Sequence, residues 1–284
     1  MKLRNRTAEI FVPDKKPLDE AISRTTRMGI SAHPDDLEIL AYDGILKSFG
    51  NDNNWFFGVT VTNGSGSPRD DLYADYSDED MKKIRIREQK KAAVVGEYGA
   101  IAFLDYPSSA VKSPKNQGPK VDIKELLMLA RPAVVYTHNL ADKHDTHVGV
   151  ALKAIQALRE LPNELKPESV YGCEVWRDLD WMVDSDKIAF DVSAHENLAA
   201  ALLGIFDSQI CGGKRYDLAT MGRRRTNATY YASDSVDITS SLIYAMDLAP
   251  LIRDTNLEIK EYITEHIKRF AQEVTENIEK LLSY

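Results

Sequence analysis

Two short segments of the sequence gather residue types that can bind a metal ion or move a proton. The first, Ser31–Glu38, reads SAHPDDLE and places His33 next to two adjacent carboxylates, Asp35 and Asp36. It follows a short apolar stretch and precedes a helical one, which is where open α/β sheets place their ligand sites. Because neighbouring aspartate side chains diverge, one can bind a metal while the other handles protons. Taken alone, the two aspartates could equally cap the following helix.

The second segment, 136–147, reads YTHNLADKHDTH and contains four further ligands or proton carriers, His138, Asp142, His144 and His147. Four of the six histidines of the chain therefore lie in these two segments. Each segment follows an expected strand, and sheet folds bring such strand ends together around a ligand site. A histidine, an aspartate and a second histidine, with open positions for water, match the three-ligand design of catalytic zinc sites.

The bulk composition excludes several other classes of protein. The chain has 36 basic and 44 acidic residues and a formal charge of −8, which disfavours a general attraction to nucleic acid or to an anionic membrane. Arg223–Arg225 could still hold an anionic group of a small ligand or form a solvated basic patch. Cys173 and Cys211 are too few for a disulfide framework or a cysteine-rich structural zinc site.

No apolar run reaches the roughly 18 to 20 residues that cross a bilayer, and the first residues lack the apolar stretch of a secretory signal. A cytoplasmic location is therefore expected.

Strand-like and helix-like stretches alternate over the first two thirds of the chain, which indicates a parallel sheet with crossover helices. The predicted fold class is α/β, a Rossmann-like doubly wound, mostly parallel sheet flanked by helices. After about residue 190 helical stretches dominate, so the C-terminal portion is expected to be largely helical. The expected strands are Met28–Ala32, Phe56–Thr62, Ile101–Tyr106, Ala133–His138 and Ser169–Trp176, and the expected helices lie near Glu38–Phe49, Asp78–Val95, Ile123–Ala130 and Val148–Leu161.

Three parts of the chain are distinguished: an N-terminal extension over residues 1–27, the main domain over 28–250 and a C-terminal amphipathic helix within 251–284, running from about Asn256 to Leu282. Apolar residues repeat every three or four positions along this last helix, which places them on one face. That face can pack onto the body of the domain or form the interface of a homo-oligomer. Its residues are Ile263, Ile267, Phe270, Val274, Ile278 and Leu281.

The motif AHPDDLE, followed later by D-x-H-x-x-H at a strand end, resembles the LmbE/PIG-L family of N-acetylglucosaminyl deacetylases. Three further segments between these two motifs are similar to the family, and weaker similarity in 191–193, 208–209 and 230–232 extends the resemblance to roughly residues 28–235. The three segments are Val61–Gly64, similar to the T-x-G loop, Arg85–Glu88, similar to the R-x-x-E helix, and Phe103–Pro107, similar to the segment after the third strand.

The resemblance implies roles for the residues of both motifs. His33, Asp36 and His147 would bind the metal, and Asp35 would be the general base that activates water. His144 would stabilise the developing oxyanion or protonate the departing amine. Zinc is the expected metal, with iron or another divalent cation as alternatives. These roles agree with metal-assisted amide hydrolysis, in which a carboxylate takes a proton from water and a second acid completes C–N cleavage.

The resemblance also implies substrate contacts from Arg85, Thr62 and Gly64. Arg85 matches an arginine that the family uses to reach sugar hydroxyls or phosphate, although pairing with Glu88 on the helix surface is a plain alternative.

The chain departs from the family pattern at several positions. Ser108 stands where family members usually offer an aspartate to the sugar, and it is retained here as a substrate contact. A Gly-Gly pair after the first motif is replaced by residues that include Tyr42 and Asp43. Asp142 is expected near the substrate and as a partner that orients His144.

The sequence therefore predicts a zinc-dependent enzyme that removes an acetyl group from an N-acetylglucosamine-type sugar or glycoconjugate. Its expected partner is a small N-acetylated sugar or glycoconjugate, with no nucleic acid, no membrane span and a possible homo-oligomer. A metal-containing sugar-binding protein without deacetylase activity is an alternative, and so is a metallo-phosphoesterase, which would need a second set of ligands. A nucleotide-binding module would need G-x-G-x-x-G after the first strand, where this chain has HPDD.

Overall fold

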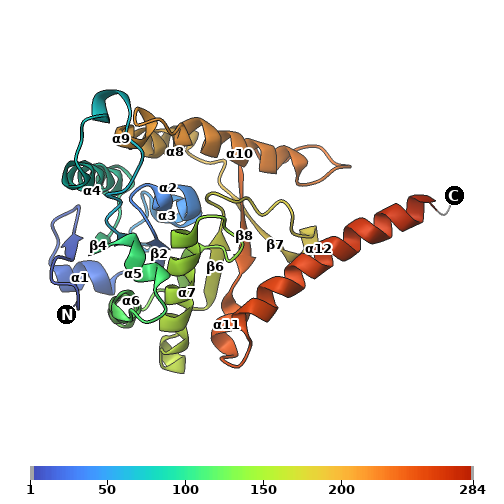
Figure 1. The fold of residues 1–284 in the computed structure, drawn as a ribbon, viewed down its shortest axis with the longest axis horizontal. Helices are drawn as coiled ribbons and strands as arrows, with labels where there is room; N and C mark the ends of the chain where they lie inside the picture. The colour runs from blue at the N-terminus through green and yellow to red at the C-terminus, as the bar shows by residue number, and fades with distance from the viewer. Residues whose placement is uncertain (1–2, 283–284) are drawn as a thin grey trace.

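One sheet organises the computed structural model, which describes residues 3–282 (Figure 1). Eight strands of the described residues form it in the order β1-β4-β3-β2-β5-β6-β8-β7. Neighbours from β4 to β6 are parallel, whereas β1 is antiparallel to β4, and β8 is antiparallel to β6 and β7. The strands are β1 Glu9–Phe11, β2 Arg27–Ser31, β3 Phe56–Thr62, β4 Ala100–Tyr106, β5 Val134–His138, β6 Ser169–Cys173, β7 Lys187–Asp191 and β8 Leu242–Asp247.

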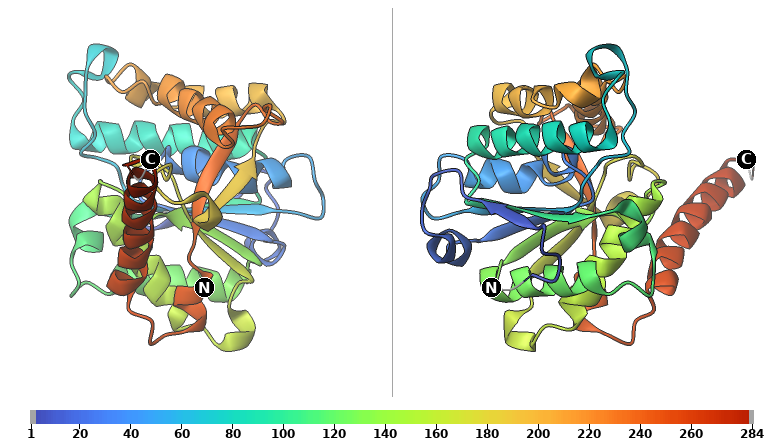
Figure 2. Two further views of the ribbon diagram at one scale, coloured as in Figure 1. Left: turned by 90° about the vertical axis from the view of Figure 1, so that its right-hand side faces the viewer. Right: turned by 60° about the vertical axis from the view of Figure 1, so that its left-hand side comes forward.

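Helices cover both faces of this sheet (Figure 2). One apolar core includes residues of α1, α6, α7 and α11, and a second, on the other face, includes residues of α2, α3, α4 and α8. The helices are α1 Leu18–Ser23, α2 Asp36–Leu40, α3 Tyr42–Ser48, α4 Asp78–Val95, α5 Ser108–Lys112, α6 Gly118–Ala130, α7 Asp145–Arg159, α8 Glu196–Gly204, α9 Asp207–Ile210, α10 Tyr216–Tyr230, α11 Ala249–Arg253 and α12 Ile259–Leu282, with single 3₁₀ turns at Asp71–Tyr73, Asn163–Leu165 and Asp184–Asp186.

The local sequence explains the central elements. Every residue of β3, FFGVTVT, is buried, as expected for a parallel strand with helices on both of its faces. At the start of α4 the Ser77 hydroxyl accepts from the Asp80 amide, and the Asp80 carboxylate accepts from the Ser77 amide. This capping box sets the helix start at the residue that the sequence predicts.

The predicted fold class is confirmed, including the largely helical C-terminal portion. The single helix expected over Glu38–Phe49 is instead two helices, because Ala41 leaves the helical conformation with φ −112° and ψ 18°. Three strands were not predicted. β1 has only three residues, and β7 and β8 join the sheet through antiparallel pairing, for which the sequence carries no local signal.

The segments before and after the main domain differ in how they pack against it. Within the expected N-terminal extension, β1 pairs with β4, and Ala21 and Ile22 of α1 enter the core. The expected C-terminal helix is α12, which extends away from the body (Figure 2). Residues 1–2 and 283–284 of these two segments lie outside the described residues. Among residues 3–282, no helix is both long and apolar enough to cross a bilayer.

The sheet order also shows where a ligand site is expected. β2 lies between β3 and β5, so the chain leaves β2 toward one side of the sheet and later returns to its other side. In open α/β sheets, ligands bind at such a switch point, beyond the carboxyl ends of the strands. The two motifs that contain His33 and His147 follow β2 and β5, respectively.

Candidate metal and catalytic site

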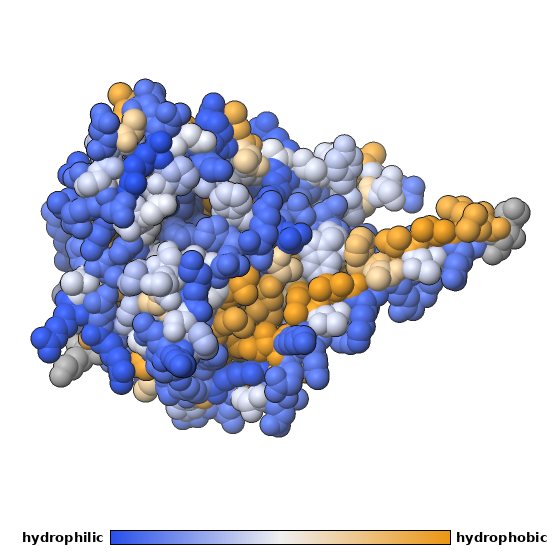
Figure 3. Space-filling model, in the orientation of Figure 1, coloured by the Kyte–Doolittle hydropathy of each residue, from blue (hydrophilic) through white to orange (hydrophobic). Residues whose placement is uncertain are grey.

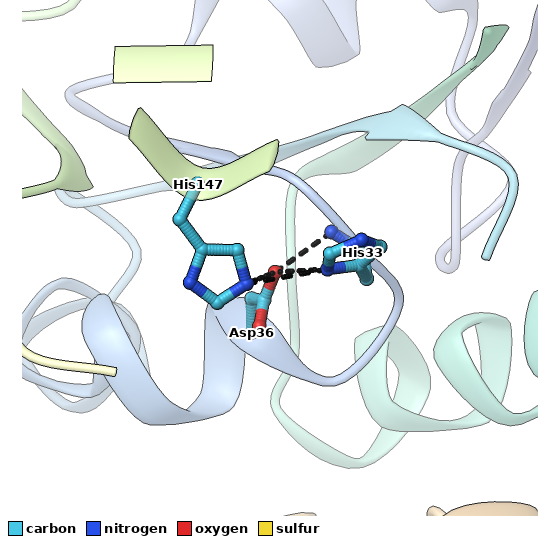
Figure 4. Close-up of side chains that lie close together, drawn as sticks. All are labelled: His33, Asp36 and His147. Carbon is cyan, nitrogen blue, oxygen red and sulfur yellow. Dashed lines mark hydrogen bonds and ion pairs between the residues drawn. The ribbon is translucent and has the colours of Figure 1, made fainter. Parts of the chain in front are cut away.

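Three donor atoms, one each from His33, Asp36 and His147, form a small triangle at the switch point (Figure 4). His33 Nδ1 lies 3.2 Å from Asp36 Oδ2 and 3.3 Å from His147 Nε2. The third side, from His147 Nε2 to Asp36 Oδ2, is 3.5 Å. The sequence motifs predicted these residues as ligands, and the fold brings them together from two distant segments.

The triangle has the size that a zinc ion requires. Zn–N and Zn–O bonds of roughly 2.0–2.2 Å in a tetrahedral site place neighbouring donor atoms about 3.3–3.5 Å apart. The pKa of His33 is lowered to about 4, because burial outweighs the attraction of Asp36, so this ring is neutral as a metal ligand must be. The donor set and its spacing therefore fit a tetrahedral divalent cation with one open position.

The turn between β2 and α2 shapes two corners of the triangle. Asp36 Oδ2 accepts a hydrogen bond from the backbone N–H of His33 at 2.7 Å, which fixes the carboxylate toward the imidazole. Burial tends to raise the pKa of Asp36, but the nearby His147 and His33 outweigh it and lower this pKa. The aspartates do not cap α2, since Asp35 occupies the N-cap position without a side-chain cap hydrogen bond.

Asp142 orients His147 and does not contact the ring of His144, contrary to the sequence-based expectation. Its Oδ2 lies 3.3 Å from His147 Nδ1 and accepts from the Trp176 amide at 3.1 Å, whereas Oδ1 accepts from the backbone amide of His144. A carboxylate behind a metal-binding histidine fixes the ring and its tautomer. The Asp142 side chain is fully buried and is not among the residues that line the cavity described below.

His138 lies beside the triangle but is engaged elsewhere. Its Nε2 accepts a hydrogen bond from the Ala32 amide at 2.8 Å, and its ring stacks on that of His147. Donor atoms of His138, Asp142 and His147 also form a compact group. All three residues are buried, and the group shares His147 with the first triangle, so it does not provide the separate, accessible second ion that a two-metal phosphoesterase needs.

Asp35 lies next to the triangle and faces the cavity. Its backbone has φ 97°, a left-handed conformation that is uncommon for a residue other than glycine. Burial raises the pKa of Asp35 well above its usual value, against the opposing effect of Arg85, whose Nη2 lies 3.1 Å from Asp35 Oδ1. A buried carboxylate with a raised pKa is suited to accept a proton.

Arg85 is a buried residue, so the alternative of a surface pair with Glu88 is wrong. Its guanidinium donates to the carbonyl oxygens of Pro34 and Gly64, and it thereby joins the loops after β2 and β3. The Glu88 carboxylate instead accepts from the amide and hydroxyl of Ser208. Arg85 also lines the cavity.

The other expected substrate contacts divide into two groups. Gly64 and Ser108 line the cavity, and Gly64 has φ +64°, a conformation that favours glycine. Thr62 does not face the cavity, because its hydroxyl donates to the carbonyl of Ala32 at 2.9 Å and it is buried in β3. Thr62 therefore connects the ends of β2 and β3.

His144 is at the N-terminus of α7 and lines the cavity. Its Nδ1 accepts a hydrogen bond from the Thr146 amide at 3.3 Å, which leaves the proton of a neutral ring on Nε2. Burial lowers the pKa of His144, which favours that neutral form.

A cavity of about 640 Å³ opens onto the triangle. Its wall includes residues that the sequence motifs did not indicate, among them Trp176 and Tyr216. Besides Arg85, four cationic side chains also line it, those of Lys112, Lys214, Arg215 and Arg223. Only the first arginine of the basic run 223–225 faces the cavity.

The other two arginines of that run have separate roles. Arg224 is buried, donates to the carbonyl of Glu38 at 2.7 Å and lies over the ring of Tyr42. Arg225 is exposed and pairs with Glu196. The run is therefore not one solvated patch.

Gln89 is a residue of the site that the sequence analysis missed. Its Oε1 accepts from the backbone amide of Asp35 at 2.9 Å, and its Nε2 donates to Glu38 Oε1 at 2.7 Å. The only signal in the sequence was its position directly after the R-x-x-E segment, on the helix that carries Arg85.

Comparison with known protein families matches the part of the chain that contains the candidate site. The family model PIG-L, described as GlcNAc-PI de-N-acetylase, matches residues 28–158, which include the whole triangle, Asp35 and His144. Over residues 28–158 this confirms the resemblance noted in the motifs, whereas the weaker similarity at 191–193, 208–209 and 230–232 lies outside the match. No curated protein matches the chain by sequence.

Several solved structures share the fold. GalB, the 4-carboxy-2-hydroxymuconate hydratase from Pseudomonas putida KT2440, has a TM-score of 0.61 at 15% identity and covers 79% of this chain and 96% of its own. N,N'-diacetylchitobiose deacetylase from Pyrococcus horikoshii has a TM-score of 0.58 at 17% identity, with 78% and 83% covered. The A40926 pseudoaglycone deacetylase Dbv21 has a TM-score of 0.56 at 16% identity, with 79% and 97% covered. At these identities the likeness is one of fold, and activity must be argued from the site.

Proposed function

Because the chain carries a domain of the PIG-L (LmbE-like) family over residues 28–158, we propose that the protein is a metal-dependent amide hydrolase. It removes the acetyl group from an N-acetylglucosamine-type sugar or glycoconjugate, and zinc is the metal. The observation that carries this proposal is the triangle of His33, Asp36 and His147, which has zinc-sized spacing and lies beside a proton acceptor at the end of an open cavity.

His33, Asp36 and His147 would hold the cation. A zinc-type cation supplies Lewis acidity, which activates water and polarises the amide carbonyl. The protein residues keep this site in order: Asp142 fixes the ring of His147, and the His33 amide fixes the Asp36 carboxylate. A site held in this way needs little rearrangement when the substrate enters.

Asp35 is the proposed general base. It takes one proton from water as the water oxygen attacks the acetyl carbon, and it returns this proton to the amine nitrogen as the C–N bond breaks. The products are a free amine and acetic acid, which retains the second proton of the water and ionises to acetate by releasing this proton to solvent or to the amine. Its burial and its position next to the triangle support this role, and Arg85 keeps the carboxylate in place.

His144 is the proposed oxyanion donor. Because its Nδ1 accepts from the Thr146 amide, its Nε2–H is available to donate to the carbonyl oxygen as negative charge develops there. Loss of one such donor typically lowers kcat 10²- to 10³-fold. We therefore expect kcat of the His144→Ala variant to be lower than that of the wild type by about this factor.

The test combines elemental analysis of the purified protein with direct measurement of acetate released from N-acetylglucosamine and simple N-acetylglucosaminides. We expect about one zinc per chain and acetate release from the wild type. Asp35→Asn should retain zinc and lose turnover, whereas His147→Ala should lose zinc.

The outcomes separate the proposal from its alternatives. Zinc without acetate release from any N-acetylated sugar would leave a metal-containing sugar-binding protein, and no zinc after reconstitution would overturn the metal site. Measuring acetate also separates amide hydrolysis from hydration of a C=C bond, the reaction named for GalB, because hydration releases no acid. Unchanged turnover in Asp35→Asn would remove this residue as the base.

A further inference from the structure

The C-terminal helix α12 is attached to the body only through its first half. His266 is its one buried residue, and Tyr262 donates a hydrogen bond to the carbonyl of Asp247. Arg269 pairs with Asp186 on the 3₁₀ turn before β7. The ring of Phe270 meets that of Trp181 edge-on. These contacts fix the first half of α12 against the body and thereby set the direction in which the second half extends.

The second half of α12 extends beyond the body. Residues 271–282 are all exposed, and Figures 1 and 2 show this part pointing away from the rest of the molecule. At 1.5 Å per residue, these twelve residues form an overhang of about 18 Å. Isolated helices of fewer than about 12–15 residues are marginal in water, and helices in proteins gain most of their stability from packing of an apolar face.

An apolar stripe runs along one face of α12 from Ile267 into this free part of the helix (Figure 3). It comprises Ile267, Phe270, Val274, Ile278 and Leu281, which expose between 39% and 74% of their surface. The spacing between successive members is 3, 4, 4 and 3 residues, so the stripe is symmetric about Val274. Read from either end of the helix, it presents apolar residues at the same positions.

We propose that the apolar stripe of α12 binds the same stripe of a second copy of this chain, with the two helices antiparallel and a two-fold axis near Val274. In this arrangement Ile267 faces the partner's Leu281, and Phe270 faces the partner's Ile278. A two-fold interface uses one surface twice and must be complementary to itself. The symmetric spacing of the stripe meets that requirement.

The charges of the helix favour the same orientation. Within residues 267–281, the part that overlaps about Val274, residues 267–273 contain two basic side chains and one acidic one, a net charge of +1, whereas residues 275–281 contain one basic and two acidic ones, a net charge of −1. Antiparallel pairing places the positive half of each helix beside the negative half of the other. Parallel pairing would place halves of like charge side by side. It would also bring the bodies of both copies to the same end of the helix pair.

The proposed overlap covers residues 267–281, where every residue of the stripe is at least 39% exposed. At its inner end Arg269 and Phe270 also contact Asp186 and Trp181 of the body, and the buried His266 lies just before it. A membrane surface fits the helix less well, because helices that bind anionic lipid carry Lys and Arg on their polar face, and this free half is acidic.

The first test is the mass of the full-length protein in solution, measured by light scattering over a range of concentrations. We expect a dimer for the wild type and a monomer for Ile278→Glu, because a buried unpaired carboxylate opposes association. Gln272→Glu is the matched control: it adds the same charge to the same half of the helix, on the opposite face, and should remain a dimer.

Cysteine cross-linking tests the orientation. Val274→Cys should form a disulfide-linked dimer under mild oxidation, and Gln272→Cys should not. Ile267→Cys alone should not cross-link, but mixing it with Leu281→Cys should produce a cross-linked heterodimer. Cross-linking of Ile267→Cys with itself would contradict the antiparallel arrangement.

Three other outcomes would overturn the pairing. They are a wild type that stays monomeric at all concentrations, an Ile278→Glu variant that remains a dimer, and a monomer that binds lipid vesicles through α12. None of these readouts depends on acetate release, so they stand or fall separately from the proposed activity.

Discussion

Asp35 combines a strained backbone with a central place in the proposed reaction. A left-handed conformation costs a residue other than glycine about 1–3 kcal/mol, and it persists only where the surroundings enforce it. Here the amide of Asp35 donates to Gln89, which in turn donates to Glu38, and the Tyr98 hydroxyl donates to the same Glu38 oxygen at 2.6 Å. All four side chains are buried, so this chain of hydrogen bonds holds the carboxylate in its position.

Replacing Gln89 should therefore impair the reaction without removing the metal. In Gln89→Met the Asp35 amide loses its acceptor, and we expect kcat/KM for acetate release to fall about 10- to 100-fold, as for other residues that support a metal site. Zinc content should stay near that of the wild type, because Gln89 contacts none of the proposed ligands.

The matched control for this variant is Lys91→Met, an exposed position on the same helix, which should leave kcat/KM unchanged. An unchanged kcat/KM in Gln89→Met would show that the conformation of Asp35 does not depend on this hydrogen bond.

At the scale of elements, the site depends on the close approach of α2 to the sheet. A Cβ atom added at Gly29 of β2 would lie 2.7 Å from the ring of Phe56, 2.8 Å from Leu37 and 3.1 Å from Ala41. Only glycine leaves room for the α2–α3 segment at this point. Because α2 begins at Asp36, the contact also determines how far this proposed ligand lies from the end of β5.

Gly29→Ala should accordingly lower stability and zinc affinity together. Overpacking of a buried contact typically costs about 1–3 kcal/mol, which urea unfolding can measure. Gly204→Ala is the control, since a Cβ at this helical position has no neighbour within 4 Å, and it should not reduce stability. Equal unfolding midpoints for Gly29→Ala and the wild type would contradict the close-approach argument.

At the scale of the whole molecule, the N-terminal segment completes one edge of the sheet. β1 pairs with β4, and the backbone amides of Arg4 and Asn5 donate to the Asp122 carboxylate at 2.6 and 3.2 Å. The Asn5 side chain adds a hydrogen bond to the carbonyl of Leu104. An open strand edge presents unpaired backbone groups that promote aggregation, and this segment covers the edge of β4.

Removing residues 1–12 should therefore destabilise the protein and expose this edge. Because each net hydrogen bond contributes roughly 0.5–1.5 kcal/mol, we expect the free energy of unfolding to fall by at least about 2 kcal/mol and aggregation on heating to increase. Asn5→Ala, which keeps β1, should show a smaller loss. A truncated protein that unfolds like the wild type would mean that β1 adds nothing to stability.

Much of the fold was predictable from the sequence because its central elements have strong local patterns. The five parallel strands are short apolar runs, and α4 begins at a capping box, so each could be recognised without knowledge of its neighbours. The order of the two motifs along an α/β pattern was enough to predict that His33 and His147 meet, since the carboxyl ends of parallel strands share one edge of the sheet.

Other features were decided only by tertiary structure. β1, β7 and β8 exist because distant strands offer pairing partners, and neither three residues nor a short apolar run specifies such a partner. The burial of Arg85, the contact of Asp142 with His147 and the link from Gln89 to Asp35 depend on where side chains point after the elements pack. A sequence pattern reports the periodicity of one segment, whereas these contacts join segments whose relative positions are determined by packing of the whole chain.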